Sequence, residues 1–367
     1  LVIPNFFQIN NINFSANYKP DPTGYEDEIQ SIFASAELSW KNQLYLTVTG
    51  RNDWDSKLAF SKQKSFFYPS VGLSALLSEM VKLPEVISYA KIRGSYTVVA
   101  SSFDRFLTNP GYEYNSQTHN WANPTVYPMD NMKPEKTKSW EIGLNLKFWG
   151  NRFNLDATYY RSNTLNQTFK VDIPSSSGYK QAIVQAGNVQ NQGLELALGF
   201  NDKWAGFGWS SNATFTLNRN KVKRLASGSV NPVTGEAIQM DEMNVGWLGK
   251  ENVAPRVILT EGGSMTDIYV YNQLTKDNNG NIKVDQNGNL GITSSNTPVK
   301  VGNLDADFNL GWTNHFTYKG IDLGVVLSAR VGGLAYSATQ GILDYYGVSE
   351  TSATARDNGG IPINNGK

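Results

Sequence analysis

Apolar and polar residues alternate strictly over long segments of the chain. In Glu141–Phe148 the even-numbered positions are Ile, Leu or Phe, and the odd-numbered positions are Glu, Gly, Asn or Lys. The alternation resumes in Phe153–Tyr160, after a short turn at Trp149–Asn151. A period of two residues predicts β-strands with one apolar face and one polar face.

Ten segments of the chain carry this signature. Most are about ten residues long, which matches the 9–11 residues that a tilted strand needs to cross a bilayer and exceeds the soluble average of about 5–6. We expect strands at Gln30–Trp40, Leu44–Asn52, Phe67–Leu77, Ser88–Val99, Ser139–Trp149, Arg152–Ser162, Asn191–Asn201, Phe207–Asn218, Ala306–Tyr318 and Ile321–Val331.

The connections between these strands alternate between short and long. Short links follow the first, fifth, seventh and ninth strands, and a small helical turn follows the third. The long links are Asp53–Phe66, Ala100–Lys138, Asn163–Gln190 and the poorly periodic Lys221–Asp305. The strands of a β-sandwich also alternate apolar and polar residues, but a sandwich is not expected to have short and long connections in strict alternation. We therefore predict an all-β fold: an antiparallel up-and-down transmembrane β-barrel with about 10–12 strands in this chain.

Aromatic residues support a membrane location for this wall, because they gather near the strand ends. Amphipathic rings are stable at the level of the lipid headgroups. The residues concerned are Trp40, Phe67, Tyr68, Tyr89, Trp140, Phe148, Trp149, Tyr159, Tyr160, Trp209 and Tyr318.

Composition excludes several classes of function. The 32 basic and 32 acidic residues give no basic surplus for nucleic acid, and the absence of cysteine excludes disulfides and thiolate chemistry. Only two histidines are present, and no nucleophile elbow or phosphate-binding loop is visible. We expect no enzymatic activity and no obligatory cofactor.

Two long links contain candidate substrate contacts. Asp53, Trp54 and Asp55 follow the second strand and would present an aromatic platform between carboxylates, as sugar sites do. The favoured alternative is that Trp54 lies at the membrane interface and the aspartates cap a turn. His119, Trp121 and Tyr127 form a second candidate, for which loop packing is again the favoured alternative.

The sequence KDNNGNIKVDQNGN holds two similar units around Asn-Gly. Asp277, Asn279, Asn281 and Asp285 resemble the first half of a calcium loop, but Gly288 occupies the place where such loops carry a bidentate Glu. We favour two tight turns without metal and keep a loop Ca²⁺ site as the alternative.

Six motifs, in order, resemble the SusC/RagA class of TonB-dependent outer-membrane transporters. The most specific is KPEKTKSWEIG, which fits a PE-x-T-x-S-x-E-x-G run that opens a barrel strand in that family. The others are YLTVTGRNDWDSKL, YPSVGLSALLSE, AKIRGSYTVVA, QAGNVQNQGLELALGF and VGNLDADFNLGWTNHFTYKG. The chain departs from the pattern at Leu304-Asp305-Ala306, which lacks a Pro, and at RNDWDSKL, which lacks a Gly.

The resemblance implies that residues 1–367 are part of one receptor barrel, without the plug domain and without the last strands. It implies TonB-dependent uptake of an oligosaccharide or peptide across the outer membrane of a Gram-negative, Bacteroidetes-type bacterium. The implied partners are the lipid bilayer, a SusD-like surface lipoprotein that closes over the long loops, and TonB, acting through the plug or N-terminal region. A soluble all-β carbohydrate-binding module is the alternative that the sequence leaves open, and a β-scaffold enzyme is a third.

Overall fold

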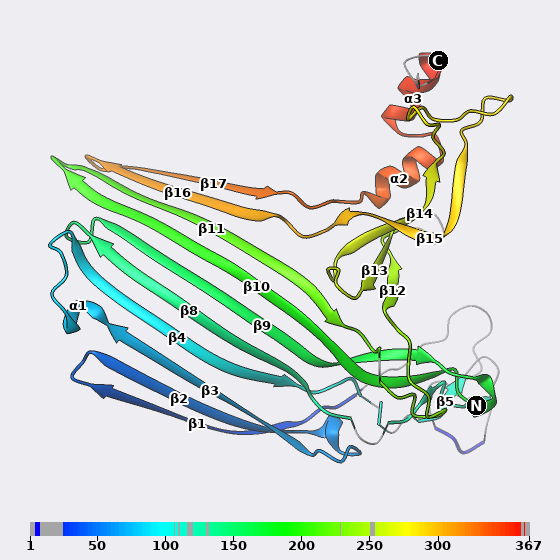
Figure 1. Cartoon of the computed structure of the whole chain (residues 1–367), viewed down its shortest axis with the longest axis horizontal. Helices are drawn as coiled ribbons and strands as arrows, with labels where there is room; N and C mark the ends of the chain where they lie inside the picture. The colour runs from blue at the N-terminus through cyan, green and yellow to red at the C-terminus, as the bar shows by residue number, and fades with distance from the viewer. Residues whose placement is uncertain are drawn as a thin grey trace.

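One large antiparallel sheet forms most of the molecule (Figure 1). The computed structural model describes residues 4–7, 25–105, 107–108, 111–115, 120–129, 132–227, 229–249, 254–360 and 363. The strands pair in the order β1-β2-β3-β4-β8-β9-β10-β11-β16-β17, and the short β7 (Val126–Tyr127) joins in parallel at the start of β10. The long strands are β1 (Ile29–Trp40), β2 (Leu44–Asp55), β3 (Ser65–Leu76), β4 (Ile87–Ser101), β8 (Glu135–Phe148), β9 (Phe153–Asp172), β10 (Gln181–Trp204), β11 (Phe207–Arg224), β16 (Phe308–Tyr318) and β17 (Ile321–Val331).

All ten predicted strands are present, and each pairs with its predicted neighbour, so the all-β, up-and-down fold class is confirmed. The sheet is open. Within the described residues, β1 and β17 each pair on one side only, and every residue of both strands is exposed. These strands are the two open edges of the sheet, with backbone groups that are unpaired on one side in the part of the chain that the structure describes.

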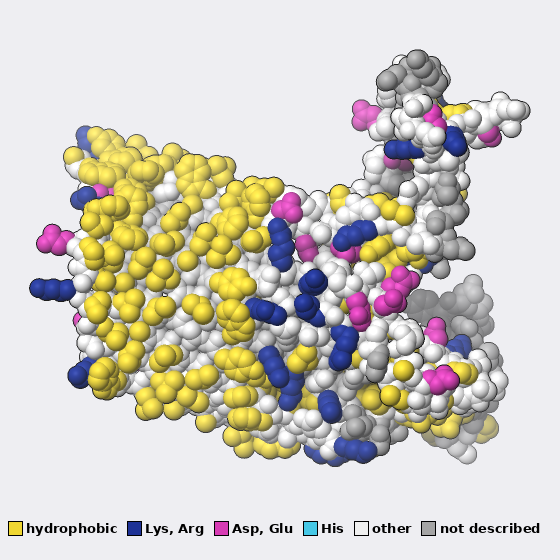
Figure 2. Space-filling view, viewed as in Figure 1, with side chains coloured by type: hydrophobic (Ala, Val, Ile, Leu, Met, Phe, Trp, Pro, Cys, Tyr) yellow, Lys and Arg dark blue, Asp and Glu magenta, His cyan; other side chains and the backbone are white. Residues whose placement is uncertain are grey.

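The register separates the two faces of the sheet. Ile142, Tyr159, Leu194 and Leu217 are aligned across β8, β9, β10 and β11 on one face. Glu141, Tyr160, Gly193 and Asn218 are aligned on the other. Figure 2 shows the apolar face, where hydrophobic side chains cover the end of the sheet that holds the short turns. In a membrane this face contacts lipid, and the polar face lines the interior.

Tight turns connect the strands at this end. Ala205 and Gly206 have φ values of 43° and 88°, and Lys319 and Gly320 have values of 44° and 85°. Two consecutive left-handed residues form the two-residue turn whose twist matches that of antiparallel strands. Trp149, Gly150 and Asn151 also have positive φ, and Trp149 is 56% exposed, as expected for an aromatic residue at the interface.

The opposite end of the sheet differs from the sequence prediction. Asn163–Gln190 was expected to be a long loop, but β9 continues to Asp172 and β10 begins at Gln181. The two strands have 20 and 24 residues. They form a long hairpin that extends past the hydrophobic region at the short-turn end of the sheet, which we call the apolar band. The prediction was wrong because this extension packs against other parts of the chain on both faces, so it lacks the exposed polar face of the lipid-contacting strands.

Lys221–Asp305 is also more regular than predicted. It contains a four-stranded sheet of β12 (Glu242–Trp247), β13 (Arg256–Thr260), β14 (Asp267–Leu274) and β15 (Ile292–Asn303). The remaining elements are a two-stranded sheet and short helices: β5 (Glu113–Asn115), β6 (Asn120–Ala122), α1 (Leu77–Met80), α2 (Ala338–Tyr345), α3 (Glu350–Asp357) and 3₁₀ turns at Ser56–Leu58 and Ser175–Ser177. No helix in the described part of the chain is long and apolar enough to cross a membrane.

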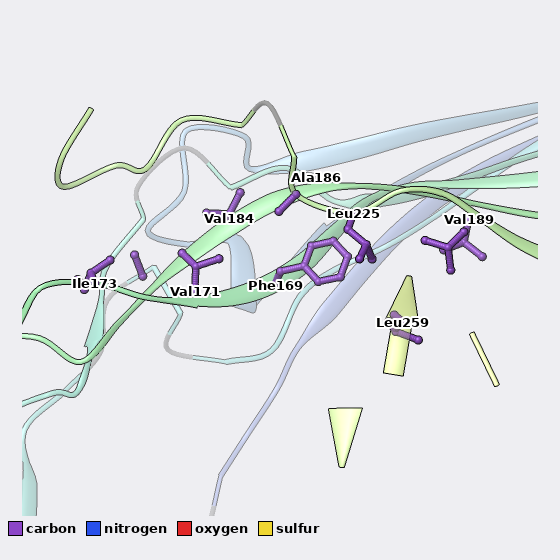
Figure 3. Packing of buried hydrophobic residues seen from close by; sticks show 11 residues of the cluster. Phe169, Val171, Ile173, Val184, Ala186, Val189, Leu225 and Leu259 are labelled. Carbon is purple, nitrogen blue, oxygen red and sulfur yellow. The ribbon is translucent and has the colours of Figure 1, made fainter. Parts of the chain in front are cut away.

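Two buried clusters lie beyond the apolar band, on the side of the long connections. The larger one joins the β9–β10 hairpin to Val222, Leu225 and Leu259 (Figure 3). The smaller one comprises Leu58, Phe66, Phe103, Met132 and Ile183. Ile183 and Val184 are consecutive on β10 but belong to different clusters, so the hairpin has protein on both faces here.

Candidate functional site

Polar side chains on the inner face are linked from strand to strand. Arg93 on β4 donates to Asp156 on β9 at 3.0 and 3.2 Å and to the Thr158 hydroxyl at 2.6 Å. Asn145 on β8 donates to the same carboxylate at 2.9 Å. The intervening strand places Gly143 beneath the guanidinium, where a Cβ atom would lie 2.6 Å from Arg93 Cζ. The Gly of the PE-x-T-x-S-x-E-x-G motif therefore leaves room for this interaction.

A second link of the same kind crosses β10. Tyr160 on β9 lies over Gly193 and donates its hydroxyl to Asn218 Oδ1 on β11 at 3.2 Å. A Cβ atom at Gly193 would lie 2.6 Å from the Tyr160 ring. Hydrogen bonds thus link polar side chains of the inner face between β4, β8 and β9 and between β9 and β11, which suits a wet or plugged interior.

A cavity of about 380 Å³ lies on the inner face over β1–β4. Arg51 forms part of its wall, donating to Asp53 Oδ1 at 2.7 Å and to Ser31 at 2.9 Å. The Tyr68 hydroxyl donates to the other oxygen of Asp53 at 2.6 Å, and Thr49 and Ser70 share a hydrogen bond of 2.6 Å. A fixed cation, an aromatic ring and hydroxyl groups can bind the polar groups of a sugar or a peptide.

The structure does not bring Asp53, Trp54 and Asp55 together on one face. Asp53 and Asp55 point inward and are 6% and 4% exposed, whereas Trp54 lies on the opposite face and is 42% exposed. Asp55 accepts from the backbone N–H of Lys57 at 2.9 Å and from the Ser102 hydroxyl, and so caps the 3₁₀ turn. The arrangement is that of an interfacial Trp and a turn cap; substrate contact by these residues stays a prediction.

The second candidate group is spread over the connection before β8. Trp121 lies on β6, opposite Tyr114 in register, and is 63% exposed. Tyr127 on β7 instead packs edge-on against Tyr179, with ring centroids 5.3 Å apart, beside the larger buried cluster. His119 lies outside the described residues. Trp121 is therefore the described member of this group that presents a large open surface.

The two Asn-Gly units of the β14–β15 connection are tight turns. Asp277 Oδ1 accepts from the backbone N–H groups of Asn279 and Asn281 at 2.8 and 2.9 Å, and Asp285 accepts from Asn287 and Asn289 at 2.8 Å each. The backbone N–H of Asn281 is the main cause that lowers the pKa of Asp277 below the usual value, and the side-chain amide of Asn289 is the main cause that lowers the pKa of Asp285. Among the described residues, no cluster of three or more acidic or histidine side chains has the arrangement of a metal site. Calcium binding at Asp277, Asn279, Asn281 and Asp285 stays a prediction.

Sequence reasoning missed Arg51, Arg93 and Asp156. It also placed Tyr68 and Tyr160 among the aromatic residues of the membrane interface, which was wrong, because both hydroxyls form hydrogen bonds on the inner face. Each of these five residues lies at a polar-face position of its strand, so the period of two residues identifies its orientation. The pairing of Arg93 with Asp156 requires the register of three strands, which no local pattern in the sequence supplies.

Comparison with known proteins agrees with this architecture. A family model described as the β-barrel of TonB dependent receptor-like proteins matches residues 4–252. TonB-dependent receptor P3 of Formosa agariphila is 25% identical over 344 residues, which cover 85% of this chain and 33% of that protein. TonB-dependent receptor SusC of Bacteroides thetaiotaomicron is 26% identical over 355 residues, covering 89% and 34%.

Among solved structures, the RagAB peptide importer in its closed-closed state is similar in fold. The TM-score is 0.63 at 17% identity, and the match covers 83% of this chain and 33% of that chain. This chain thus spans about a third of the length of the relatives that it matches.

Proposed function

Because the chain belongs to the TonB dependent receptor-like β-barrel family, we propose that it forms part of the wall of a transporter that imports nutrients with energy from TonB. Membership of this family confirms the predicted outer-membrane location in a Gram-negative bacterium and the expectation that the chain is not an enzyme. It gives no support to a soluble carbohydrate-binding module.

The observation that carries the proposal is the division of one sheet into a lipid face and a hydrogen-bonded inner face. Links such as Arg93–Asp156 connect strands across the inner face, and the 380 Å³ cavity beside Arg51 and Tyr68 opens on that face. A solute that passes inside this wall meets charged groups, hydroxyls and a ring. These groups suit polar oligomers better than apolar molecules.

The proposed substrate is an oligosaccharide or a peptide. The similarity to SusC and to the fold of a peptide importer supports this range. The long connections would then meet the substrate, with the exposed Trp121 as the leading contact. A SusD-like lipoprotein would close over them from outside, and TonB would act through a plug region.

Uptake by whole cells tests the proposal. Cells that lack the protein should accumulate less of either a labelled oligosaccharide mixture or a labelled peptide mixture, and collapse of the proton-motive force should abolish the difference. Trp121→Ala should reduce uptake several-fold, whereas Trp54→Ala, an exposed Trp on the lipid face, should leave it unchanged. A tagged protein should co-purify with a surface lipoprotein. Equal uptake of both mixtures with and without the protein would refute the proposal.

A further inference from the structure

Basic side chains form a band on the lipid face, directly beside the hydrophobic region (Figure 2). Two neighbouring register rows across β8, β9, β10 and β11 make up its centre. One row is Trp140, Arg161, Gln192 and Arg219, and the next is Lys138, Asn163, Gln190 and Lys221. Four of these eight residues are cations and none is acidic. We call Lys138, Arg161, Arg219 and Lys221 the basic belt.

The change from apolar to basic is abrupt. The adjacent row toward the short turns is Ile142, Tyr159, Leu194 and Leu217, which carries no charge. Successive rows on one face are two residues apart, or about 7 Å along the strands. Trp140 and Tyr159 lie at this border with ring centroids 5.5 Å apart and are 38% and 40% exposed. Such exposed rings mark the depth of the lipid headgroups.

At the other border of the apolar region, exposed lysines such as Lys41 and Lys319 lie in the short turns, and the aligned strand positions of β8, β9 and β10 are aromatic. The aligned row there is Phe148, Phe153, Phe200 and Ser211. Arg152, in the turn that follows β8, pairs with Asp202 at 3.1 Å. Short turns lie on the periplasmic side of outer-membrane barrels and long connections on the outside. The basic belt therefore lies at the outer leaflet, so a ligand that it binds belongs to that leaflet.

The belt is ordered yet keeps charge available. Arg161 donates to Gln190 Oε1 at 3.0 Å, and Gln190 donates to Gln192 Oε1 at 2.9 Å, so neutral amides hold the guanidinium in place. Arg219 donates to the backbone carbonyl oxygens of Asp307 at 3.0 Å and Asn218 at 3.5 Å. Lys138 and Lys221 are exposed and form no ion pair with a carboxylate in the described part of the chain.

We propose that Lys138, Arg161, Arg219 and Lys221 bind the phosphate groups of a phosphorylated glycolipid of the outer leaflet, the lipid A part of lipopolysaccharide. The acyl chains of that lipid lie along Ile142, Leu194 and Leu217, and its phosphates reach the belt one and two rows higher. Guanidinium groups bind phosphate through two parallel hydrogen bonds, and the lysines add point charges. The belt would fix the lipid around this part of the wall.

Lipid binding to the intact purified protein tests the proposal. The belt variant is Lys138→Gln/Arg161→Gln/Arg219→Gln/Lys221→Gln. The control variant, Lys41→Gln/Lys82→Gln/Lys203→Gln/Lys319→Gln, removes the same charge from exposed lysines beside the short turns. Native mass spectrometry in detergent would measure binding of lipid A with two phosphates, of lipid A with none, and of inorganic phosphate.

The wild type and the control variant should bind bis-phosphorylated lipid A equally, and the belt variant at least about tenfold more weakly, since each basic residue near an anionic surface contributes roughly fivefold. Phosphate-free lipid A should bind all three weakly and alike. Equal binding by the belt variant would overturn the proposal, as would full displacement of the lipid by millimolar inorganic phosphate, which would indicate a site for free phosphate.

Heat-modifiable migration in gels confirms that each variant forms a barrel. If the fourfold belt variant does not fold, Lys138→Gln/Lys221→Gln replaces it, because these two exposed lysines are not ion-paired with a carboxylate. This pair should still weaken binding severalfold, and unchanged binding would again refute the proposal.

Discussion

The guanidinium of Arg93 lies across Gly143 and binds the carboxylate of Asp156, one strand farther on. Three strands, β4, β8 and β9, are thereby joined by one side chain in addition to their backbone ladders. The pair is partly solvated, with 32% and 39% of the two side chains exposed. Its importance is therefore as much geometric as energetic, because it fixes the register of three strands.

Gly143→Val should remove this link without touching either charged residue. Its Cβ would lie 2.6 Å from Arg93 Cζ, so the guanidinium must leave Asp156. We expect a loss of about 1–2 kcal/mol in unfolding free energy, measured by denaturant titration in vesicles. Gly72→Val is the control, since the nearest atom to its Cβ would be 3.9 Å away. Equal losses at both positions would contradict the explanation.

Leu144→Lys tests which face contacts lipid. Leu144 shares the apolar face with Ile142 and is aligned with Ala157 and Ile92. A lysine near the bilayer midplane costs about 2–4 kcal/mol. Asn145→Lys should be tolerated, because its neighbour across the sheet is Asp156, with Asn145 Nδ2 now 2.9 Å from that carboxylate. The yield of protein folded into vesicles measures the effect of both variants. A lower yield for Asn145→Lys than for Leu144→Lys would show that the two faces are assigned the wrong way round.

Acid should open the two turns of the β14–β15 connection. The pKa of Asp277 is lowered mainly by the backbone N–H of Asn281, and that of Asp285 mainly by the side-chain amide of Asn289. A lowered folded-state pKa stabilises the turns above the usual value of 3.8, and this stability is lost as the pH falls through the lowered pKa.

Carboxyl ¹³C NMR titration of labelled aspartates measures this effect. Both residues should titrate with midpoints below 3.8. Asn289→Ala should raise the midpoint of Asp285, and Asn281→Ala should raise that of Asp277 by less, because the main donor there is backbone. Midpoints at or above 3.8 in the wild type would show that the turns are not formed.

Ile183→Ala and Val184→Ala should loosen different parts of the outer region. Ile183 is 0% exposed in the cluster with Leu58 and Phe103, and Val184 is 4% exposed in the cluster with Leu225 and Leu259. Large-to-small changes of this kind cost about 1–5 kcal/mol locally. Limited proteolysis should cleave residues 102–134 first in Ile183→Ala and residues 225–262 first in Val184→Ala. Cleavage at the same sites in both would mean that the clusters form one core.

The strands were predictable because one physical constraint repeats along the chain. Lipid on one face and a polar interior on the other produce the alternation of Ile142, Leu144 and Leu146 with Glu141, Asn145 and Lys147, which fixes strand, face and order. The inward position of Arg93 and Asp156 follows from the same rule, but their contact does not, because it depends on register across β8.

The structure beyond the apolar band was harder to predict, because each face of the β9–β10 hairpin packs against a different part of the chain there. Phe169, Val171, Ala182 and Val184 still alternate, but their partners come from residues as far along the chain as Leu259. The same alternation separates Trp54 from its sequence neighbours Asp53 and Asp55. Trp54 lies on one face of the sheet, and both aspartates lie on the other. A candidate site proposed from adjacent strand residues must therefore be checked against the period of two residues.

The meander of the large sheet has a consequence for assembly. Its strands can be added as successive hairpins until β11, after which residues 225–307 intervene before β16. An unstructured loop of that length would cost about 3 kcal/mol more in closure entropy than a three-residue turn. The four-stranded sheet shortens the gap: Val222 N–H donates to the Gly263 carbonyl at 2.8 Å, and Leu304 N–H donates to the Thr266 carbonyl at 3.1 Å. Early folding of this insert outside the membrane would hold β16 beside β11 and set the rate at which the wall grows past that strand.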